Sequence, residues 1–187
     1  MIDKLKARPV NHSRTTLSEL MIPSYTNFGG KIHGGTILSI MDKIAYVCAT
    51  KHAGNYCVTA SIDSVDFLSA VEIGSQLSLY ASVNYVGKSS LVVGIKVVSE
   101  DIKLGIVKHT NTSYFSMVAM DEDHKPIKVP ALLLETKEDI RRFLEAKKRK
   151  ELKKENKSRH DAIKLGDDFE CDMEDLLATE NCLINLK

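Results

Sequence analysis

The chain has 187 residues, enough for one domain with a full hydrophobic core and an appendage. Its net charge of +1 gives no whole-chain argument for binding nucleic acid or a membrane surface. No apolar run approaches the roughly 20 residues of a membrane span, and the N-terminus lacks the apolar stretch of a secretory signal. The four cysteines show no CxxC spacing. We therefore expect a cytoplasmic protein with reduced thiols and without a zinc site.

The first part of the chain is expected to form an arm, a strand, a loop and a long helix. Residues 1–13 are interpreted as a loose arm, and Arg14–Ile22 as a first strand. Four glycines fall within Asn27–Gly35, which predicts a tight loop where the backbone approaches another backbone or a ligand. From residue 36 apolar residues recur at helical spacing, so a helix is expected to run to Gly54, a favourable helix stop.

After this helix the hydrophobic period changes from 3.6 to 2 residues. Strands are expected over Tyr56–Leu68, Gln76–Val86, Ser90–Glu100 and Ile106–Met120. The turns between them are short, which predicts an antiparallel meander with one face on a core and one partly wet face. The long helix is the element expected to cover the core face, which gives an α+β fold.

The composition changes after Pro130. Residues 131–160 are expected to hold a basic charged helix, because residues 137–159 carry eleven Lys or Arg against five Asp or Glu. Residues 161–187 form an acidic tail, with eight acidic against two basic residues. This tail either carries a short docking helix or stays a disordered polar tail.

The charged helix has its apolar anchors and its starting signal near its beginning. Thr136 followed by Asp139 loosely matches a capping box. The expected apolar anchors are Ile140, Phe143 and Leu144. We therefore expect the start of this helix to pack on the rest of the chain.

Three features around the glycine loop can carry chemistry. Asp42 lies in the long helix on the flank of its apolar stripe, where a carboxylate is either partly desolvated or a border residue exposed to water. The loop feeds the positive end of the helix dipole, so a backbone N–H of Gly34 or Gly35 is a candidate donor to a developing oxyanion. Asn27, in the same loop, is also a residue type that is common in turns.

These residues, in their order along the chain, resemble one family. The pattern comprises Asn27, His33-Gly34-Gly35, Met41-Asp42, Val58–Asp63, Val65-Asp66-Phe67, Gly74, Val86–Ser90, Phe115 and Val118–Asp121. It resembles the hotdog-fold acyl-CoA thioesterases, in the group of the YciA-type enzymes and the cytosolic long-chain acyl-CoA hydrolases. The resemblance implies that residues 14–130 form a hotdog domain, an antiparallel β-sheet wrapped around one long central helix. It also implies a homo-oligomer, in which protomers pair into a continuous sheet and three such dimers often form a hexamer.

The resemblance also implies roles for particular residues. Asp42 and Asn27 are implied as catalytic, drawn from opposite protomers of the dimer. The turn Gly87-Lys88-Ser89-Ser90 is implied to contact coenzyme A, whose phosphates favour a cation such as Lys88. The chain departs from the family pattern at His33, where members often have Phe, and at residues 69–70, where many have Pro. Acyl-chain preference is the property that these departures put in question.

We therefore predict an acyl-CoA hydrolase that releases free fatty acid and CoA. Asp42 is expected as general base on water or as nucleophile, and Asn27 of the partner protomer as the residue that positions water or substrate. No cofactor is expected beyond the CoA of the substrate. No metal site is expected either, because the spacing of His33, His52 and His109 fits no metal motif. The expected partners are acyl-CoA, CoA and further copies of the chain, without nucleic acid or membrane.

Two alternatives belong to other functional classes. One is a non-catalytic acyl-CoA-binding or scaffold protein that keeps the fold without turnover, since fold alone does not determine function. The other is a nucleic-acid-binding or partner-binding role for the basic segment 137–159. The basic run that follows Phe143 in this segment has no interleaved aromatic residues, which weakens the second alternative.

Overall fold

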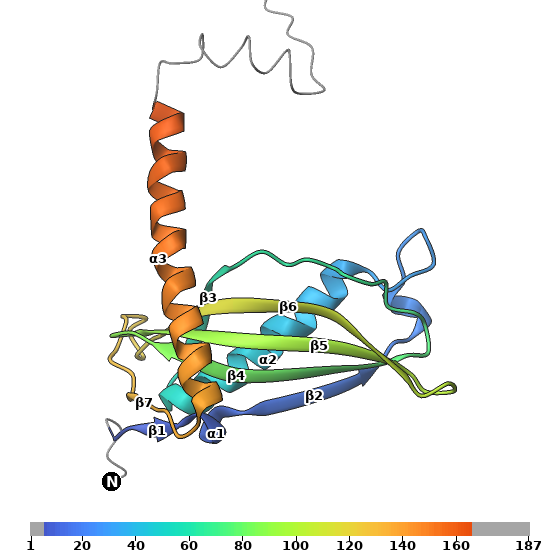
Figure 1. Cartoon of the computed structure of the whole chain (residues 1–187), viewed down its shortest axis with the longest axis horizontal. Helices are drawn as coiled ribbons and strands as arrows, with labels where there is room; N and C mark the ends of the chain where they lie inside the picture. Colours follow the sequence, from blue (N-terminus) through green and yellow to red (C-terminus); the bar gives the residue numbers. More distant parts are fainter. Residues whose placement is uncertain (1–5, 166–187) are drawn as a thin grey trace, which may run out of the picture. The chain divides into compact units, whose positions relative to one another are not determined.

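The computed structural model describes residues 6–165 of the chain. The chain divides into two compact units, Met1–Ala146 and Lys147–Lys187. Along the chain the elements are β1 (Arg8–Pro9), α1 (Val10–Ser13), β2 (Thr15–Leu20), the 3-10 turn η1 (Pro23–Tyr25), α2 (Gly34–Ala53), β3 (Cys57–Ile62), β4 (Gln76–Val86), β5 (Ser90–Asp101), β6 (Ile106–Ala119), β7 (Leu132–Leu133) and α3 (Lys137–Leu165) (Figure 1). Over residues 6–165, no helix is both long and apolar enough to cross a membrane.

Five of the strands form one antiparallel sheet in the order β2-β4-β5-β6-β3. The long helix α2 lies along one face of this sheet, and the strands curve around it (Figure 1). β1 and β7 make a separate two-stranded parallel pair. The expected α+β hotdog fold, a sheet wrapped around one long helix, is confirmed.

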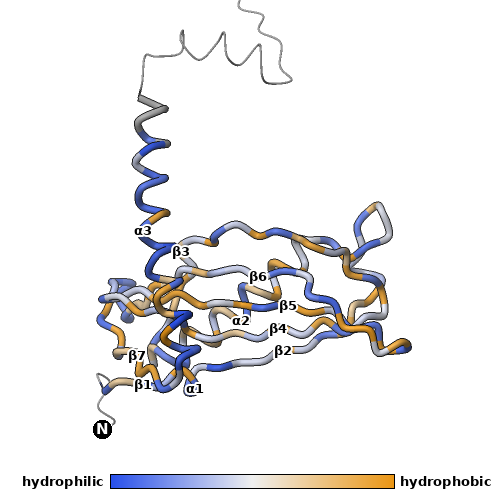
Figure 2. The backbone as a smooth tube through the Cα atoms, in the orientation of Figure 1, coloured by the Kyte–Doolittle hydropathy of each residue, from blue (hydrophilic) through white to orange (hydrophobic). Residues whose placement is uncertain are grey.

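The hydrophobic core lies between the sheet and α2. The alternation predicted for β4 is confirmed as far as Val83, because Leu77, Leu79, Ala81 and Val83 are all buried. It ends there, because the register shifts between Val83 and Tyr85, and Tyr85, which was expected on the same face, packs against Phe143 of α3. The helix contributes the buried stripe Ile37, Met41, Ile44, Ala45, Cys48 and Ala49. In Figure 2 this alternation appears as changes of colour along the strands. Burying a large apolar side chain contributes about 1.5–3 kcal/mol, so this stripe is what holds α2 on the sheet.

α2 ends where the sequence predicts. Gly54 follows its last residue with φ 71°, a left-handed conformation that glycine adopts without strain. The Gly54 N–H donates to the Thr50 carbonyl at 2.8 Å. At the other end, the cap is the side chain of His33, which accepts a hydrogen bond from the Gly35 N–H. This capping role of His33 was not predicted from the sequence.

The predicted meander is wrong in the placement of one strand. β3 pairs with β6, from Cys57↔Ala119 to Ile62↔Phe115, while the second neighbour of β4 is β2. The physical reason is the connection after β3. Residues 63–75 form an irregular segment instead of a tight turn, so β3 reaches the far edge of the sheet. β3 is also shorter than the expected strand, because it ends at Ile62.

The described part of the N-terminal arm is not loose. Arg8–Pro9 pair with Leu132–Leu133, and the helix α1 contacts α2. The Arg8 guanidinium donates to the carbonyls of Lys51 and His52, both at 2.9 Å. A cation is favourable there, because the C-terminal carbonyls of a helix carry partial negative charge. The arm therefore closes the C-terminal end of α2.

The capping box expected at the start of α3 is confirmed. The Thr136 N–H donates to Oδ2 of Asp139 at 3.0 Å, and the Asp139 N–H donates to Oγ1 of Thr136 at 3.1 Å. Asp139 is 5% exposed, and its Oδ1 lies 3.5 Å from the Arg14 guanidinium. The first turn of α3 is thus held by its own cap and by the ion pair of Asp139 with Arg14, the residue before β2.

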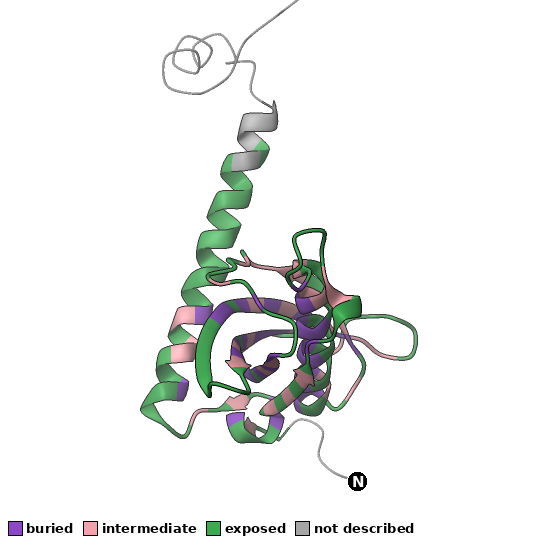
Figure 3. Ribbon diagram, turned by 90° about the vertical axis from the view of Figure 1, so that its right-hand side faces the viewer, coloured by how far each residue is buried: buried purple, intermediate pink, exposed green. Residues whose placement is uncertain are grey.

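Only one of the three expected anchors of α3 holds. The half-buried Phe143 packs against Tyr85 with ring centroids 5.1 Å apart, but Ile140 and Leu144 are 47% and 58% exposed. The cause is helical phase. The positions that pack are 139, 143 and the buried Ala146, and residues 140 and 144 lie about 100° away from them. In Figure 3 the buried and half-buried residues of α3 lie in its first turns.

The acidic tail was expected over residues 161–187, but its first five residues belong to α3, which continues to Leu165. Residues 166–187 lie outside the described part of the chain. The apolar residues of the possible docking helix are Phe169, Met173, Leu176 and Leu177. Cys171 and Cys182 also lie in this part. These predictions stay predictions.

Candidate active site

The glycine loop is built around Asn27. Its side-chain oxygen accepts from the N–H of Gly29 at 2.9 Å and from the N–H of Lys31 at 3.2 Å. Its own N–H donates to the Lys31 carbonyl at 2.8 Å, so residues 27–31 close on themselves. Asn27 is exposed, and within the described residues its amide NH2 group makes no hydrogen bond. The turn-forming role of Asn27 is therefore observed, and its NH2 group is still available to a ligand.

The first turn of α2 leaves one backbone donor unused. The Gly35 N–H is bound by Nδ1 of His33 at 2.9 Å, and the N–H groups of Thr36 and Ile37 donate to the His33 carbonyl at 2.9 and 3.4 Å. Among the described residues, the Gly34 N–H has no acceptor. Of the two candidate oxyanion donors, Gly34 is thus the one that is free, at the positive end of the helix dipole.

Gly34 packs closely against Phe67. A Cβ at this position would lie 3.2 Å from Cζ of Phe67, which comes from the irregular segment after β3. A larger side chain at position 34 would therefore require the ring or the helix start to shift by a few tenths of an ångström.

Asp42 is exposed on the flank of α2, the second of the two expected environments. Its Oδ1 accepts a hydrogen bond from Oγ1 of Thr59 in β3 at 2.6 Å. A short bond to a carboxylate fixes the orientation of that carboxylate. Thr59 was not predicted as a site residue. It lies in the stretch Val58–Asp63 that carries part of the family resemblance, but a threonine on the polar face of a strand has by itself no catalytic signature.

One protomer does not bring these groups together. Asp42 follows Gly34 by eight residues along α2, which at 1.5 Å per residue places it about 12 Å further along the helix axis. The loop with Asn27 precedes the helix start. The candidate donor and the candidate base therefore lie too far apart to act on one carbonyl carbon within a single chain.

The surface that carries Asp42 has features of an interface. β3 is an edge strand of the described sheet, with β6 on one side only. Beside it, Tyr46 and Val47 of α2 are 40% and 39% exposed, and Tyr56 is 51% exposed. The rings of Tyr46 and Tyr56 lie 5.9 Å apart. An open strand edge next to exposed aromatic and aliphatic side chains is a surface that can pair with a second chain.

The turn expected to contact CoA is a tight β-turn between β4 and β5. The Gly87 N–H donates to the Ser90 carbonyl at 2.7 Å. The carbonyls of Lys88 and Ser89 accept from the N–H groups of Val129 and Ala119 at 3.0 and 2.9 Å. The backbone is thus held by the domain, while the Lys88 side chain is exposed and has no partner in the described residues. This arrangement can present a cation to a phosphate.

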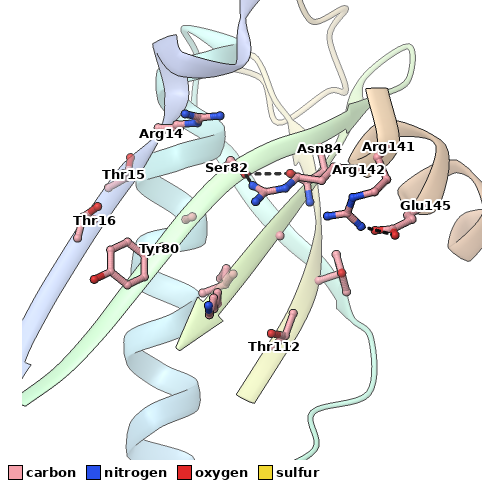
Figure 4. Close-up of a pocket in the computed structure, with 15 residues that line it drawn as sticks. Arg14, Thr15, Thr16, Tyr80, Ser82, Asn84, Thr112, Arg141, Arg142 and Glu145 are labelled. Carbon is pink, nitrogen blue, oxygen red and sulfur yellow. Dashed lines mark hydrogen bonds and ion pairs between the residues drawn. The ribbon is translucent and has the colours of Figure 1, made fainter. Parts of the chain in front are cut away.

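A pocket of about 530 Å³ lies away from these residues. It is lined among others by Arg14, Tyr80, Ser82, Asn84 and Arg142 (Figure 4). Tyr80 and Ser82 alternate with the core residues of β4, so the pocket opens on the sheet face opposite to α2. Its polar groups bind one another: Ser82 donates to Asn84 at 2.9 Å, and Arg142 lies 3.5 Å from Ser82. We interpret it as the seam between the sheet and the start of α3.

Two cysteines and two histidines of the described residues have roles in packing or hydrogen bonding. Within residues 6–165, no group of three or more His, Cys, Asp or Glu is placed to hold a metal ion. Burial raises the pKa of Cys48 to about 12 and that of Cys57 to about 11, so both thiols stay protonated. Burial also lowers the pKa of His52, which bonds to the Pro130 carbonyl at 3.1 Å. The ring of His109 contacts Thr112 at 2.9 Å.

The sequence is similar to a thioesterase family and to several known proteins. A model of the thioesterase superfamily matches residues 29–106. The chain is 43% identical to protein VdlD of Helicobacter pylori, over 76% of this chain and 82% of that protein. It is 34% identical to YkhA of Bacillus subtilis, described as an uncharacterized acyl-CoA thioester hydrolase, over 83% and 90%. It is 28% identical to a rat cytosolic acyl coenzyme A thioester hydrolase, over 75% of this chain and 37% of that protein.

Solved structures also resemble this fold. An apo-hexameric acyl-CoA thioesterase is 40% identical, with a TM-score of 0.78 over 81% of this chain and 97% of that one. The acyl-CoA hydrolase of Staphylococcus aureus, solved with butyryl-CoA, CoA and CoA disulfide, is 31% identical, with a TM-score of 0.77 over 84% and 96%.

That hydrolase has also been solved with alanine in place of an asparagine, an aspartate and a threonine. In its sequence the aspartate follows the asparagine by 15 residues and the threonine follows the aspartate by 17. Asn27, Asp42 and Thr59 have the same residue types at the same spacing.

Proposed function

This chain belongs to the thioesterase superfamily and is an acyl-CoA thioester hydrolase, and from that premise we propose that its active site is shared between two copies of the chain. The observation that carries the proposal is the separation of about 12 Å between the Gly34 donor and Asp42 along one helix. A two-fold dimer pairs the same surface of both subunits. If α2 helices pack antiparallel across it, the middle of one helix faces the glycine loop of the other.

In this site Asp42 acts on the thioester. As general base, it takes a proton from water while the water oxygen attacks the carbonyl carbon. The tetrahedral intermediate then collapses with cleavage of the carbon–sulfur bond, and the departing sulfur takes the proton that Asp42 holds, so that the carboxylic acid and CoA thiol are released. Direct attack by Asp42 to give an anhydride, later hydrolysed by water, is the alternative route. In both routes the Thr59 hydroxyl keeps the carboxylate in one orientation, supported by their 2.6 Å hydrogen bond.

The oxyanion is stabilised by the partner subunit's Gly34 through its backbone N–H. A preorganised donor of this kind contributes on the order of 3 kcal/mol in the transition state. The Gly35 N–H, which the sequence left as an equal candidate, is occupied by His33 in this structure. The partner subunit's Asn27 positions water or the thioester through its free amide NH2 group. The reaction draws on water and protein groups, without a cofactor beyond the CoA of the substrate.

CoA is bound at the turn Gly87-Lys88-Ser89-Ser90, where the exposed Lys88 ammonium contacts a phosphate and the serine hydroxyls supply further hydrogen bonds. The chain assembles through the β3 edge and the exposed face of α2, and three such dimers form a hexamer. This assembly is supported by the hexameric state of a thioesterase that is 40% identical. We further propose a cytoplasmic location, in line with the rat cytosolic relative.

Subunit mixing tests the shared site. Asn27→Ala and Asp42→Ala are each expected to abolish release of free thiol from a panel of short to long acyl-CoAs. When the two variants are unfolded together and refolded, half of the dimers are hybrids. Each hybrid has one wild-type site, so about a quarter of wild-type activity returns.

The control is each variant refolded alone, which should stay inactive. Sites made within one chain would give no activity in the mixture, since every site would then carry one substitution. The acyl-CoA panel on the wild type also reports the preferred chain length. A wild type that binds CoA but turns over no acyl-CoA would contradict the proposed mechanism.

A further inference from the structure

We propose that the pocket at the seam between the sheet and the start of α3 is a binding site for a small phosphate ester, separate from the thioester site. All of its lining residues belong to the unit Met1–Ala146, so the pocket lies within one compact body. It opens on the sheet face opposite to α2, next to the first turns of α3 (Figure 4). Its volume of about 530 Å³ falls within the range of small-molecule pockets, roughly 300–1,000 Å³.

The pocket exists because a glycine and a β-bulge meet in the middle of the sheet. Gly94 of β5 pairs with Ser82 of β4 and brings no side chain to this face. The register of β4 shifts between Val83 and Tyr85, which makes Asn84 the extra residue of a bulge. The Asn84 amide lies over Gly94, because a Cβ at Gly94 would clash with Nδ2 of Asn84. The bulge thus aims a polar side chain into the space that the glycine leaves open.

Asn84 brings an unused donor into the pocket although the residue is buried. It is 6% exposed, and its Oδ1 accepts a hydrogen bond from the Ser82 hydroxyl at 2.9 Å. Within residues 6–165 the NH2 group of the same amide has no acceptor. Burying an amide donor without an acceptor costs free energy, and nearly all such groups in folded proteins are paired. An oxygen atom of a ligand in the pocket would satisfy this donor.

The charge around the pocket is positive. Four cations line it against one carboxylate, that of Glu145. Glu145 and the neighbouring Glu138 pair with Arg141, and Asp139 pairs with Arg14. With Glu138 and Asp139 included, four positive charges face three negative ones. The four cations are Arg14, Lys96, Arg141 and Arg142.

Two of these cations have donors left for an anion. Nε of Arg142 donates to Glu138 at 2.7 Å, while its Nη1 lies 3.5 Å from the Ser82 hydroxyl, a long contact. The Lys96 ammonium is exposed and has no partner in the described residues. The donors therefore come from different elements, Asn84 from β4, Lys96 from β5 and Arg142 from α3. A phosphate group offers each of them an oxygen in a different direction, whereas the two oxygens of a carboxylate lie in one plane.

The rest of the pocket has room for the organic part of an ester. Tyr80 lies opposite Lys96 in the β4–β5 pairing, and both residues line the pocket. The Tyr80 side chain is half-exposed and offers an apolar ring with a hydroxyl at its end. Inorganic phosphate alone would fill only a minor part of the volume. We therefore expect an ester to bind more tightly than the free ion.

Titration calorimetry on the full chain tests this site, with glycerol 3-phosphate, inorganic phosphate and succinate as probes at constant ionic strength. Glycerol 3-phosphate should bind several-fold more tightly than inorganic phosphate, and succinate at least tenfold more weakly. Arg142→Gln removes the guanidinium, and Gly94→Ala pushes the Asn84 amide aside while every charge stays. Each should weaken glycerol 3-phosphate about tenfold, since a charge-assisted hydrogen bond is worth that much. Equal binding of all three probes, or unchanged affinity in both variants, would overturn the proposal.

The matched control is Lys88→Gln, which also removes one cation, but from the turn proposed to bind CoA. The affinity for glycerol 3-phosphate should stay as in the wild type. Loss of binding in Lys88→Gln together with full binding in Arg142→Gln would place the phosphate at the CoA turn and overturn the pocket site. The measurement needs no turnover, so its failure is distinct from failure of the proposed hydrolysis.

A crystal structure with glycerol 3-phosphate supplies a readout that needs no variant. The phosphate should lie within hydrogen-bonding distance of Asn84 Nδ2 and of the Arg142 guanidinium, on the sheet face opposite to α2. The Asn55 amide, which already donates to the Ala53 carbonyl at 3.3 Å, should keep its contact. An empty pocket in crystals held well above the measured Kd, or a phosphate bound only elsewhere, would contradict the proposal.

Discussion

The two long helices of the chain begin in opposite ways. α3 starts with a reciprocal capping box between Thr136 and Asp139, and Asp139 is buried next to Arg14. α2 starts on a glycine-rich loop, with a single titratable cap from His33 and one backbone donor, that of Gly34, without an acceptor. In the first start the polar groups bind one another, whereas the second is capped by an imidazole and leaves a donor without an acceptor.

The two helix starts differ in what they can contribute, one to the stability of the fold and the other to the chemistry of the site. A helix start whose polar groups bind each other can only hold the helix in place. A start that leaves an N–H group free at the positive end of the dipole can stabilise a negative charge that develops in a substrate. Substitutions at the start of α2 should therefore change turnover, and substitutions at the start of α3 should change the free energy of unfolding.

The largest effect is expected for Gly34→Ala. The new Cβ would lie 3.2 Å from the Phe67 ring, so the ring or the helix start must shift. We expect kcat to fall by up to roughly 10²-fold, because the displaced N–H no longer reaches the oxyanion. Steady-state kinetics together with thermal unfolding check this.

The matched control is Ser39→Ala, a small change at an exposed residue later in the same helix. It should keep kcat within a few-fold. A Gly34→Ala protein with full kcat would show that this donor has no part in catalysis. A large loss of thermal stability without loss of kcat would show that the start of α2, like that of α3, only stabilises the fold.

An intermediate effect is expected for Asp139→Ala. The change removes the carboxylate that caps Thr136 and faces Arg14, which should cost about 1–2 kcal/mol of the free energy of unfolding. For a chain of this size that lowers Tm by roughly 2–8 °C. The kcat of the folded protein should not change. Glu151→Ala, an exposed acidic residue later in α3, is the control and should leave Tm within about a degree.

The smallest effect concerns the pH dependence of the start of α3. Hydrogen bonds from Arg141 and Arg142 lower the pKa of Glu138 from 4.5 to about 2. A lowered pKa contributes stability above about pH 4.5, and this contribution is lost as the pH falls toward 2. The Tm difference between the wild type and Glu138→Gln should therefore shrink over that range at low salt. A difference that stays constant down to pH 2 would contradict the ion pairs, which are exposed and screened by salt.

The parts of the fold that follow from local patterns were predictable. The bounds of β4 match the predicted strand, and α2 ends at Gly54, because alternation, helical period and a left-handed glycine depend on neighbouring residues. The capping box of α3 depends on residues three apart, and it too is confirmed. The catalytic roles of Asn27 and Asp42 came from a family resemblance and remain a proposal.

The parts that depend on distant residues were not predictable. β3 pairs with β6, while the long irregular segment after β3 leads to β4. The residue pattern of β3 alone could therefore not predict which strand it pairs with. The hydrogen bond of Thr59 to Asp42 is a consequence of that placement. Ile140 and Leu144 have the composition of anchors, but the phase in which α3 meets the sheet leaves them exposed.

The sequence by itself determined the elements of this protein: one long helix after a glycine loop, a set of alternating strands, and a charged helix with its own cap. Those features arise from interactions between residues a few positions apart. Only the tertiary structure decided which strand lies at the edge, which hydroxyl orients Asp42 and which glycine keeps a free N–H. Such outcomes depend on how chain segments pack across the sheet, and no short window of sequence contains both partners.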